Sequence, residues 1–152
     1  MKIKGEYTYT ILIQNMFHTY IFRTNHHNLV TDDGLELALK CMTGTNNGVT
    51  FGDVHVGTGT LEPQLTDTLE QFTDKEALNE ANECEVEIVP EKNKITYNIT
   101  GDGEKINSTT EIGVWSTDEK TLVSHDRHDQ WNVPSGSLVS LQYTFTMTNY
   151  YD

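Results

Sequence analysis

Basic residues are scarce in this chain. Its 152 residues include 10 Lys and Arg against 23 Asp and Glu, which gives a formal net charge of −13 at pH 7. Phosphate backbones and anionic lipid surfaces both require a basic face on their protein partner. We therefore expect no binding to nucleic acid and no attraction to a membrane surface.

Cysteine is also scarce, with Cys41 and Cys84 as the two examples. They lie far apart and within apolar patterns, so they form neither a disulfide framework nor a C-x-x-C metal clip. We expect both to be buried free thiols, which suits a reducing cytoplasm.

Long apolar runs are missing. No stretch approaches the roughly 18 apolar residues that cross a bilayer, and the opening MKIKGEYTYT lacks the apolar centre of a secretory signal. We expect no membrane insertion and no export by the usual signal. The length matches one domain, so the prediction is a single domain over 1–152.

Apolar and polar residues alternate along most of the chain, which is typical of half-buried strands. The segments with this pattern are 7–13, 18–22, 49–56, 84–88, 95–99, 110–114, 122–123 and 139–147. Short strands separated by turn residues predict an all-β fold, either an antiparallel β-sandwich or a jelly-roll-like domain. The expected core consists of Ile11, Ile13, Leu35, Leu39, Val86, Ile88, Ile95, Tyr97, Ile112, Val114, Leu141, Tyr143 and Phe145.

One α-helix is expected over residues 32–43. Its apolar residues recur at i, i+3, i+4 and i+7 and form one stripe, which we expect to face the core: Leu35, Ala38, Leu39 and Met42. Thr31, Asp32 and Asp33 are candidate N-caps, and Asp33 has a glutamate at capping-box spacing. Gly44 follows the last turn, where a left-handed residue ends a helix easily.

Residues 57–69 read as a long loop shaped by Gly57, Gly59 and Pro63. The segment GTGT at 57–60 resembles a phosphate-binding loop only in composition, because the Gly-Lys-Ser/Thr ending is missing. We expect both glycines to have positive φ and to shape the loop rather than bind a ligand.

The densest group of metal-capable side chains is the segment HDRHD at 125–129. One contiguous cluster rarely supplies a complete set of metal ligands, so a solvated loop is the favoured interpretation. Asp53 and His55 share a strand face, and a site there would need a third partner such as His26 or His27. The sequence predicts no catalytic residue, no metal and no cofactor.

Four aromatic residues, Trp115, Trp131, Tyr150 and Tyr151, could form a stacking platform for a glycan. Core packing or a subunit contact is the favoured interpretation, because aromatic residues dominate both. We therefore take Tyr150, Tyr151 and Trp131 as candidate interface residues and 1–10 as a candidate assembly arm, and we expect a homo-oligomer.

Three stretches, in this order, carry a family resemblance. They are HNLVTDDGL at 27–35, VHVGTGT at 54–60 followed by Pro63 and TDTL at 66–69, and TEIGVW at 110–115 before a Thr-rich last strand. Together they resemble a family of small structural proteins encoded in the virion-gene clusters of tailed phages and prophages.

The resemblance implies a non-enzymatic β-sandwich building block of a virion, assembled in the host cytoplasm with other virion structural proteins. Its position stays open among tail, baseplate, neck, fibre and capsid, where it would be a decoration protein. The alternative function is a binding module at the particle surface that recognises a host glycan or receptor.

Overall fold

The computed structural model describes residues 2–14, 19–78, 83–89, 94–134 and 136–148. Its elements in chain order are β1 (Lys2–Gln14), β2 (Thr19–Val30), α1 (Asp32–Thr43), β3 (Phe51–Gly57), η1 (Leu69–Gln71), β4 (Asp74–Ala77), β5 (Glu83–Val89), β6 (Lys94–Asp102), η3 (Gly103–Lys105), β7 (Glu111–Ser116), β8 (Leu122–Arg127) and β9 (Leu138–Thr148). Most side chains of β1, β2 and β5 lie outside the described part. The described residues are mostly β with one short α-helix, α1, as expected.

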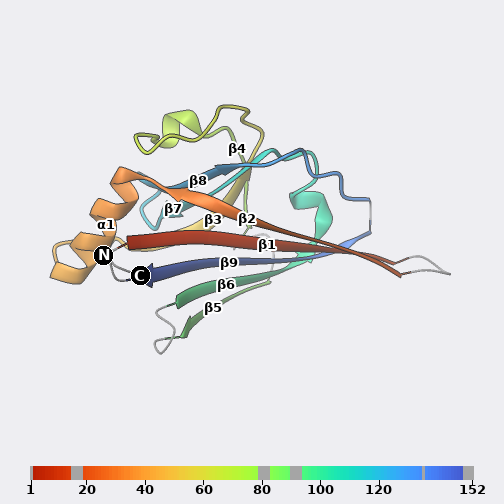
Figure 1. Ribbon diagram of the computed structural model, residues 1–152, viewed down its shortest axis with the longest axis horizontal. Helices are drawn as coiled ribbons and strands as arrows, with labels where there is room; N and C mark the ends of the chain where they lie inside the picture. The colour runs from red at the N-terminus through yellow and green to blue at the C-terminus, as the bar shows by residue number, and fades with distance from the viewer. Residues whose placement is uncertain (1, 15–18, 79–82, 90–93, 135, 149–152) are drawn as a thin grey trace.

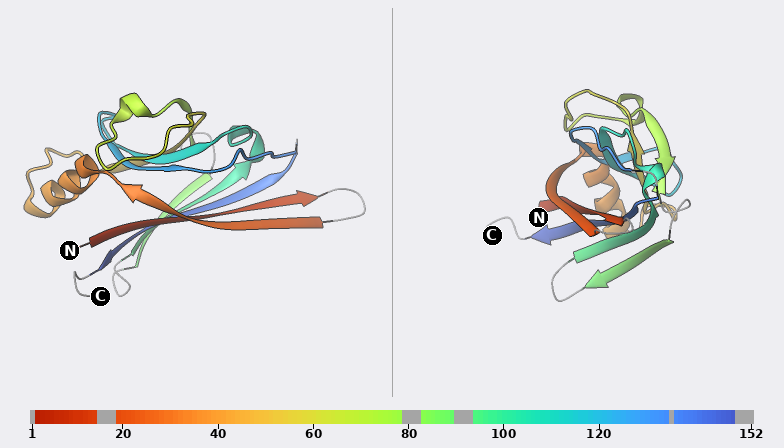
Figure 2. Two further views of the ribbon diagram at one scale, coloured as in Figure 1. Left: turned by 45° about the horizontal axis from the view of Figure 1, so that its top comes forward. Right: turned by 90° about the vertical axis from the view of Figure 1, so that its right-hand side faces the viewer.

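The strands form two antiparallel sheets that share β2 (Figure 1). Hydrogen bonds join them in the order β4-β3-β7-β8-β2-β1-β9-β6-β5. Most of β2 pairs with β1, whereas Leu29 and Val30 at its end pair with β8. The first sheet contains β1, β2, β9, β6 and β5, and the second contains β4, β3, β7, β8 and the end of β2. The end-on view in Figure 2 shows strands of the second sheet lying over those of the first.

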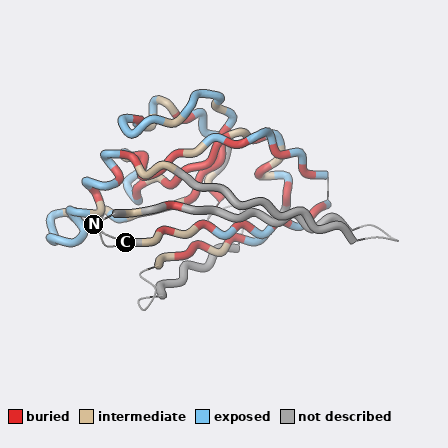
Figure 3. The backbone as a smooth tube through the Cα atoms, in the orientation of Figure 1, coloured by how far each residue is buried: buried red, intermediate tan, exposed pale blue. Residues whose placement is uncertain are grey.

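Buried apolar side chains from both sheets form one core. Figure 3 marks the buried residues along the strands in red. Side chains of the two sheets meet in this core: the rings of Phe51 and Phe145 lie 5.1 Å apart, and the Ser124 and Tyr143 hydroxyls are 2.6 Å apart. Of the expected core, the buried members are Tyr97, Ile112, Val114, Leu141, Tyr143 and Phe145, with Ile95 partly buried. The side chains of Ile11, Ile13, Val86 and Ile88 lie outside the described residues.

Helix α1 has the expected bounds, 32–43. Its N-cap is Thr31, whose hydroxyl accepts from the Gly34 N–H at 2.9 Å, and Gly44 at φ 72° ends it in the left-handed conformation. Asp32 and Asp33 lie in the first turn instead of capping it, where acids interact favourably with the helix dipole.

The orientation of α1 differs from the expectation. Leu37 and Gly34 are buried, whereas Leu35, Leu39 and Met42 are 38%, 48% and 62% exposed. The reason is the close approach at Gly34, where a Cβ would lie 2.1 Å from the Val123 carbonyl oxygen of β8. The helix backbone therefore rests on β8 along the glycine side, and the predicted stripe turns outward.

The candidate assembly arm, 1–10, lies mostly in a paired strand. Residues 2–10 belong to β1, which pairs with β2 on one side and β9 on the other, so they are part of an interior strand of the sheet. Cys41 is exposed instead of buried, and the side chain of Cys84 lies outside the described residues.

No helix in the described ranges is both long and apolar enough to cross a membrane.

Candidate functional site

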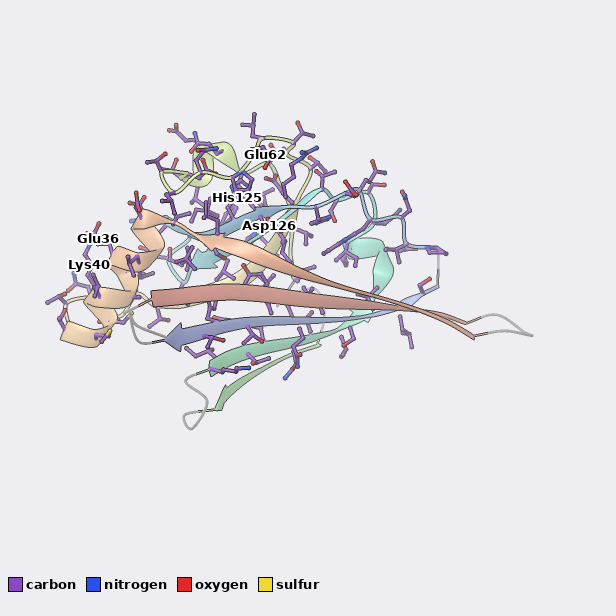
Figure 4. The ribbon with its side chains drawn as sticks, viewed as in Figure 1. Glu36, Lys40, Glu62, His125 and Asp126 are labelled. Carbon is purple, nitrogen blue, oxygen red and sulfur yellow. The ribbon has the colours of Figure 1, made fainter. Side chains whose placement is uncertain are left out.

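The most unusual polar cluster lies on β3, β7 and β8, beneath the segment 58–73 that connects β3 to β4. We call this segment the strap. Strand register places His55, Gly113 and His125 side by side across the three strands. Figure 4 shows His125 on β8 below the strap residue Glu62.

His125 is fully buried between two carboxylates. Its Nδ1 lies 2.8 Å from Oδ2 of the strap residue Asp67, and its Nε2 lies 2.8 Å from Oε2 of Glu111 on β7. Asp67 and Glu111 are themselves buried. The three side chains form a buried triad of ionisable groups.

The hydrogen bonds of the triad define its charge. A neutral imidazole has one N–H, so it can donate to only one of two carboxylates, whereas an imidazolium donates to both. Burial alone would lower the pKa of His125, but the hydrogen bonds and negative charges of Glu111 and Asp67 outweigh it and raise that pKa above its ordinary value. The two carboxylate contacts and the raised pKa of His125 both favour its protonated form, the imidazolium.

Glu111 also holds both ends of the strap. Its Oε1 accepts from the backbone N–H groups of Gly59 and Thr73, each at 2.7 Å. The neck between these ends closes through a hydrogen bond from Thr58 N–H to the Thr73 carbonyl at 2.9 Å. A single carboxylate thus connects His125 to the two points where the strap leaves the sheet.

The role of the two loop glycines differs from the prediction. Neither Gly57 nor Gly59 has positive φ. A Cβ on Gly57 would lie 2.6 Å from Glu111 Oε1, and one on Gly59 would lie 2.5 Å from the same atom. Gly59 is needed because the Glu111 carboxylate approaches its backbone closely, whereas at Gly57 the nearest atom to a Cβ would be the Thr73 carbonyl oxygen, at 2.3 Å. Pro63 lies half-buried farther along the strap.

Further contacts fix the middle of the strap. The Gln64 N–H donates to Asp67 Oδ2 at 2.9 Å, next to the bond from His125. The Leu65 carbonyl accepts from the N–H of Asp32 at the start of α1, at 2.8 Å. At the exposed edge, Arg127 pairs with Glu62 at 3.2 Å.

Aromatic rings pack beside the triad. Phe72 of the strap lies 5.4 Å from the His125 ring and 5.7 Å from the Trp115 ring. His55 stacks on Trp115 at 3.8 Å and pairs through Nδ1 with Asp74 at 3.0 Å. Among the described residues, His55 Nε2 and Trp115 Nε1 are buried and have no hydrogen-bond partner.

The expected solvated loop at 125–129 is therefore wrong for both histidines, because His125 lies in β8 at 0% exposure and His128 is also buried. His128 stacks on Trp131 at 3.7 Å, and Trp131 is 3% exposed within the chain's own core, so its ring is not presented to a partner. Tyr150 and Tyr151 lie outside the described residues.

The site considered at Asp53 and His55 also differs from its expected arrangement. The partner of His55 is Asp74 rather than Asp53, and the side chains of His26 and His27 lie outside the described part. Trp115 is stacked on His55 and partly covered, so it does not form an open stacking platform for a sugar.

The triad cannot converge on one metal ion, because its carboxylates bind opposite edges of the imidazole ring. Within the described ranges, no group of three or more His, Cys, Asp or Glu side chains has an arrangement that could hold one. Both ring nitrogens of His125 are engaged, so it offers no lone pair for proton abstraction. The geometry serves to hold the strap.

Sequence reasoning missed Asp67 and Glu111. Their separations from His125 are 58 and 14 positions, so no local spacing connects them. A signal was present, because both lie in the stretches 66–69 and 110–115 that carry the family resemblance.

No protein-family model, no curated protein and no solved structure matches this chain.

Proposed function

We propose that the chain is a non-enzymatic structural component of a tailed-phage virion that works through contacts with other subunits. The observation that carries the proposal is an exposed apolar surface, which we call the α1 face. It consists of Leu35, Leu39 and Met42 of α1 together with Leu61 and Leu65 of the strap.

One backbone hydrogen bond links the two elements that carry the α1 face. The hydrogen bond from Asp32 N–H to the Leu65 carbonyl joins the start of α1 to the strap. The strap leucines are 62% and 53% exposed, as open as the helix side chains. Large exposed apolar patches mark protein–protein contact sites. This supports assembly with copies of the chain and with other virion proteins.

The polar cluster supports the non-enzymatic part of the proposal. His125, Asp67 and Glu111 satisfy one another's hydrogen bonds in a site without solvent exposure. Such a closed arrangement favours a structural role over acid–base catalysis, which needs a group within reach of a substrate.

The finer fold name belongs to the same proposal. Contacts between the sheets, such as Phe51 with Phe145 and Ser124 with Tyr143, support a β-sandwich. A sandwich with one outward apolar helix suits a repeated particle subunit, whether in the tail, baseplate, neck, fibre or capsid.

The test compares Leu39→Lys with Leu138→Lys by sedimentation velocity. Leu138 is a matched control because it is 57% exposed but belongs to β9 and not to the α1 face. We expect the wild type and L138K to associate as concentration rises and L39K to remain monomeric. A wild type that stays monomeric, alone and with other proteins of the particle, would contradict the proposal.

The virion assignment has its own measurement. Mass spectrometry of purified particles from a phage or prophage that encodes the chain should find it at many copies per particle. A few copies would favour the surface glycan- or receptor-binding module, and its absence would overturn the assignment.

A further inference from the structure

We infer that the buried triad is a proton-dependent latch that holds the strap on the sheet and so maintains the α1 face for assembly. This inference concerns the regulation of the surface in the proposed function and rests on that function. It stands on three observations: the placement of the triad, the shared role of Glu111, and the bond between strap and helix.

The triad joins the strap to the sheet through one imidazolium. Asp67 belongs to the strap, whereas His125 and Glu111 belong to β8 and β7. When His125 loses its proton, one ring nitrogen faces a carboxylate without an N–H between them. The buried carboxylate at that edge then lacks its donor, which is a costly arrangement in a dry site.

Glu111 extends the effect to the ends of the strap. The carboxylate that binds His125 through Oε2 accepts the Gly59 and Thr73 N–H groups through Oε1. A shift of this carboxylate therefore disturbs the neck, and a shift of Asp67 disturbs the turn at Gln64. The two carboxylates together couple the ring to most of the strap's length.

Other charged groups around the triad are already paired. Arg127, two residues along β8, pairs with Glu62, and His55 pairs with Asp74 next to the aromatic rings. Asp126 follows His125 on the strand, so it lies on the opposite face of the sheet. Among the described residues, Asp67 and Glu111 are thus the charges in direct contact with the ring.

The closed strap also carries an internal cost. Phe72 packs on Trp115, whose Nε1 is buried without a hydrogen-bond partner, as is Nε2 of the stacked His55. Opening the strap exposes this region to water, which can satisfy such groups. The latch therefore opposes a cost that favours opening.

Opening changes the α1 face because the strap supplies part of it. Leu61 and Leu65 move with the strap, and the Leu65 carbonyl is the acceptor for the first N–H of α1. An open strap separates these leucines from Leu35 and Leu39. Assembly through the α1 face should therefore weaken when the latch is released.

The effect of pH on the closed strap follows from the raised pKa of His125 in the closed state. In the open state the pKa of this histidine has its ordinary value of about 6.5. The latch is fully present below about pH 6.5 and is lost as pH rises through the closed-state pKa. Between these two values the opening equilibrium should grow by about tenfold per pH unit.

The experiment is an NMR titration of the full chain from neutral to alkaline pH. It follows the ring nitrogens of His125 and the backbone amides of Gly59 and Thr73, with sedimentation velocity at each pH. We expect both ring nitrogens to be protonated at neutral pH. The ring, the strap amides and the association should change with one midpoint, above the ordinary histidine value.

Two strap variants sharpen the test. Asp67→Asn keeps the shape of the latch but removes one charge, so it should lower the His125 midpoint and loosen the strap at neutral pH. Glu62→Gln removes a charge from the same strap, at the exposed pair with Arg127. It should change neither the His125 midpoint nor the strap amides. The Asp67→Asn variant keeps the His125 ring and the sheet residues unchanged, because Asp67 belongs to the strap.

The outcomes separate this inference from the proposed function. The latch is overturned if the strap amides do not change as His125 titrates, or if His125 is neutral at neutral pH. Concentration-dependent association then remains as support for the proposed function. Association that stays constant while the strap opens overturns the control of assembly. Absence of association at every pH overturns the proposed function instead. The response of the strap amides to the His125 titration then still tests the latch.

Discussion

At the scale of single residues, glycine has an unusual role beside the triad. Gly57 and Gly59 are needed because other atoms lie against their α-carbons, the Thr73 carbonyl and Glu111 at Gly57 and the Glu111 carboxylate at Gly59, not because their backbone is left-handed. The absence of a side chain at these positions lets one carboxylate reach two backbone N–H groups and a histidine. The packing around Glu111 therefore depends on the smallest residue type.

We predict that Gly59→Ala destabilises the protein by about 1–3 kcal/mol, the cost of losing hydrogen bonds to a buried charged group. The new Cβ would lie 2.5 Å from Glu111 Oε1 and displace the carboxylate. Urea unfolding measures the change, with exposed Thr60→Ala in the same strap as the control. Equal stability of the two variants would show that Glu111 moves aside without loss.

At the scale of elements, α1 is defined by its ends and by one close contact. Thr31 caps its start and also donates from its hydroxyl to the Leu122 carbonyl, so the cap is itself anchored to β8. Gly34 then brings the helix backbone against Val123. This contact, more than the apolar stripe, decides which side of the helix faces inward.

We predict that Gly34→Ala destabilises the fold by about 1–3 kcal/mol, the usual cost of overpacking. In a solvent-exposed helix the same change stabilises by about 1 kcal/mol, so the sign distinguishes the two situations. Thermal unfolding followed by circular dichroism gives the measurement. Cys41→Ala is the control, since Cys41 lies exposed on the same helix. A gain in stability for G34A would place the helix farther from β8 than the structure has it.

At the scale of the whole molecule, the core depends on side chains that meet between two sheets. Phe145 of β9 is 2% exposed and contacts Phe51 of β3, Tyr97 of β6 and Tyr143 of its own strand. The side chain thus links both sheets in one apolar cluster. Its loss would leave a cavity between the layers.

We predict that Phe145→Ala lowers the free energy of unfolding by about 3–5 kcal/mol, the transfer and cavity cost of a buried phenylalanine. Leu138→Ala, at an exposed position at the start of the same strand, should change it little. Denaturant unfolding of both variants provides the test. A small loss for F145A, similar to that of L138A, would mean that the register of β9 is wrong.

Elements that depend on neighbours in the chain could be predicted from the amino-acid sequence alone. Alternation located the strands near 95–99 and 139–147, and the stripe and Gly44 predicted the helix at its observed bounds. These patterns are local, because a strand repeats every two residues and a helix every 3.6. The parity of Phe145 and Tyr143 also correctly predicted burial.

Features that depend on distant contacts follow from the packing of the folded chain and not from local patterns. The rotation of α1 follows from Gly34 meeting β8, and the burial of His125 follows from a strap that covers its strand. An amphipathic pattern shows that a stripe exists but not what lies opposite it. A cluster such as 125–129 shows which groups can carry charge but not which acids approach them. Those acids, Asp67 and Glu111, arrive through the pairing of β7 with β8 and through the strap, which local spacing does not encode.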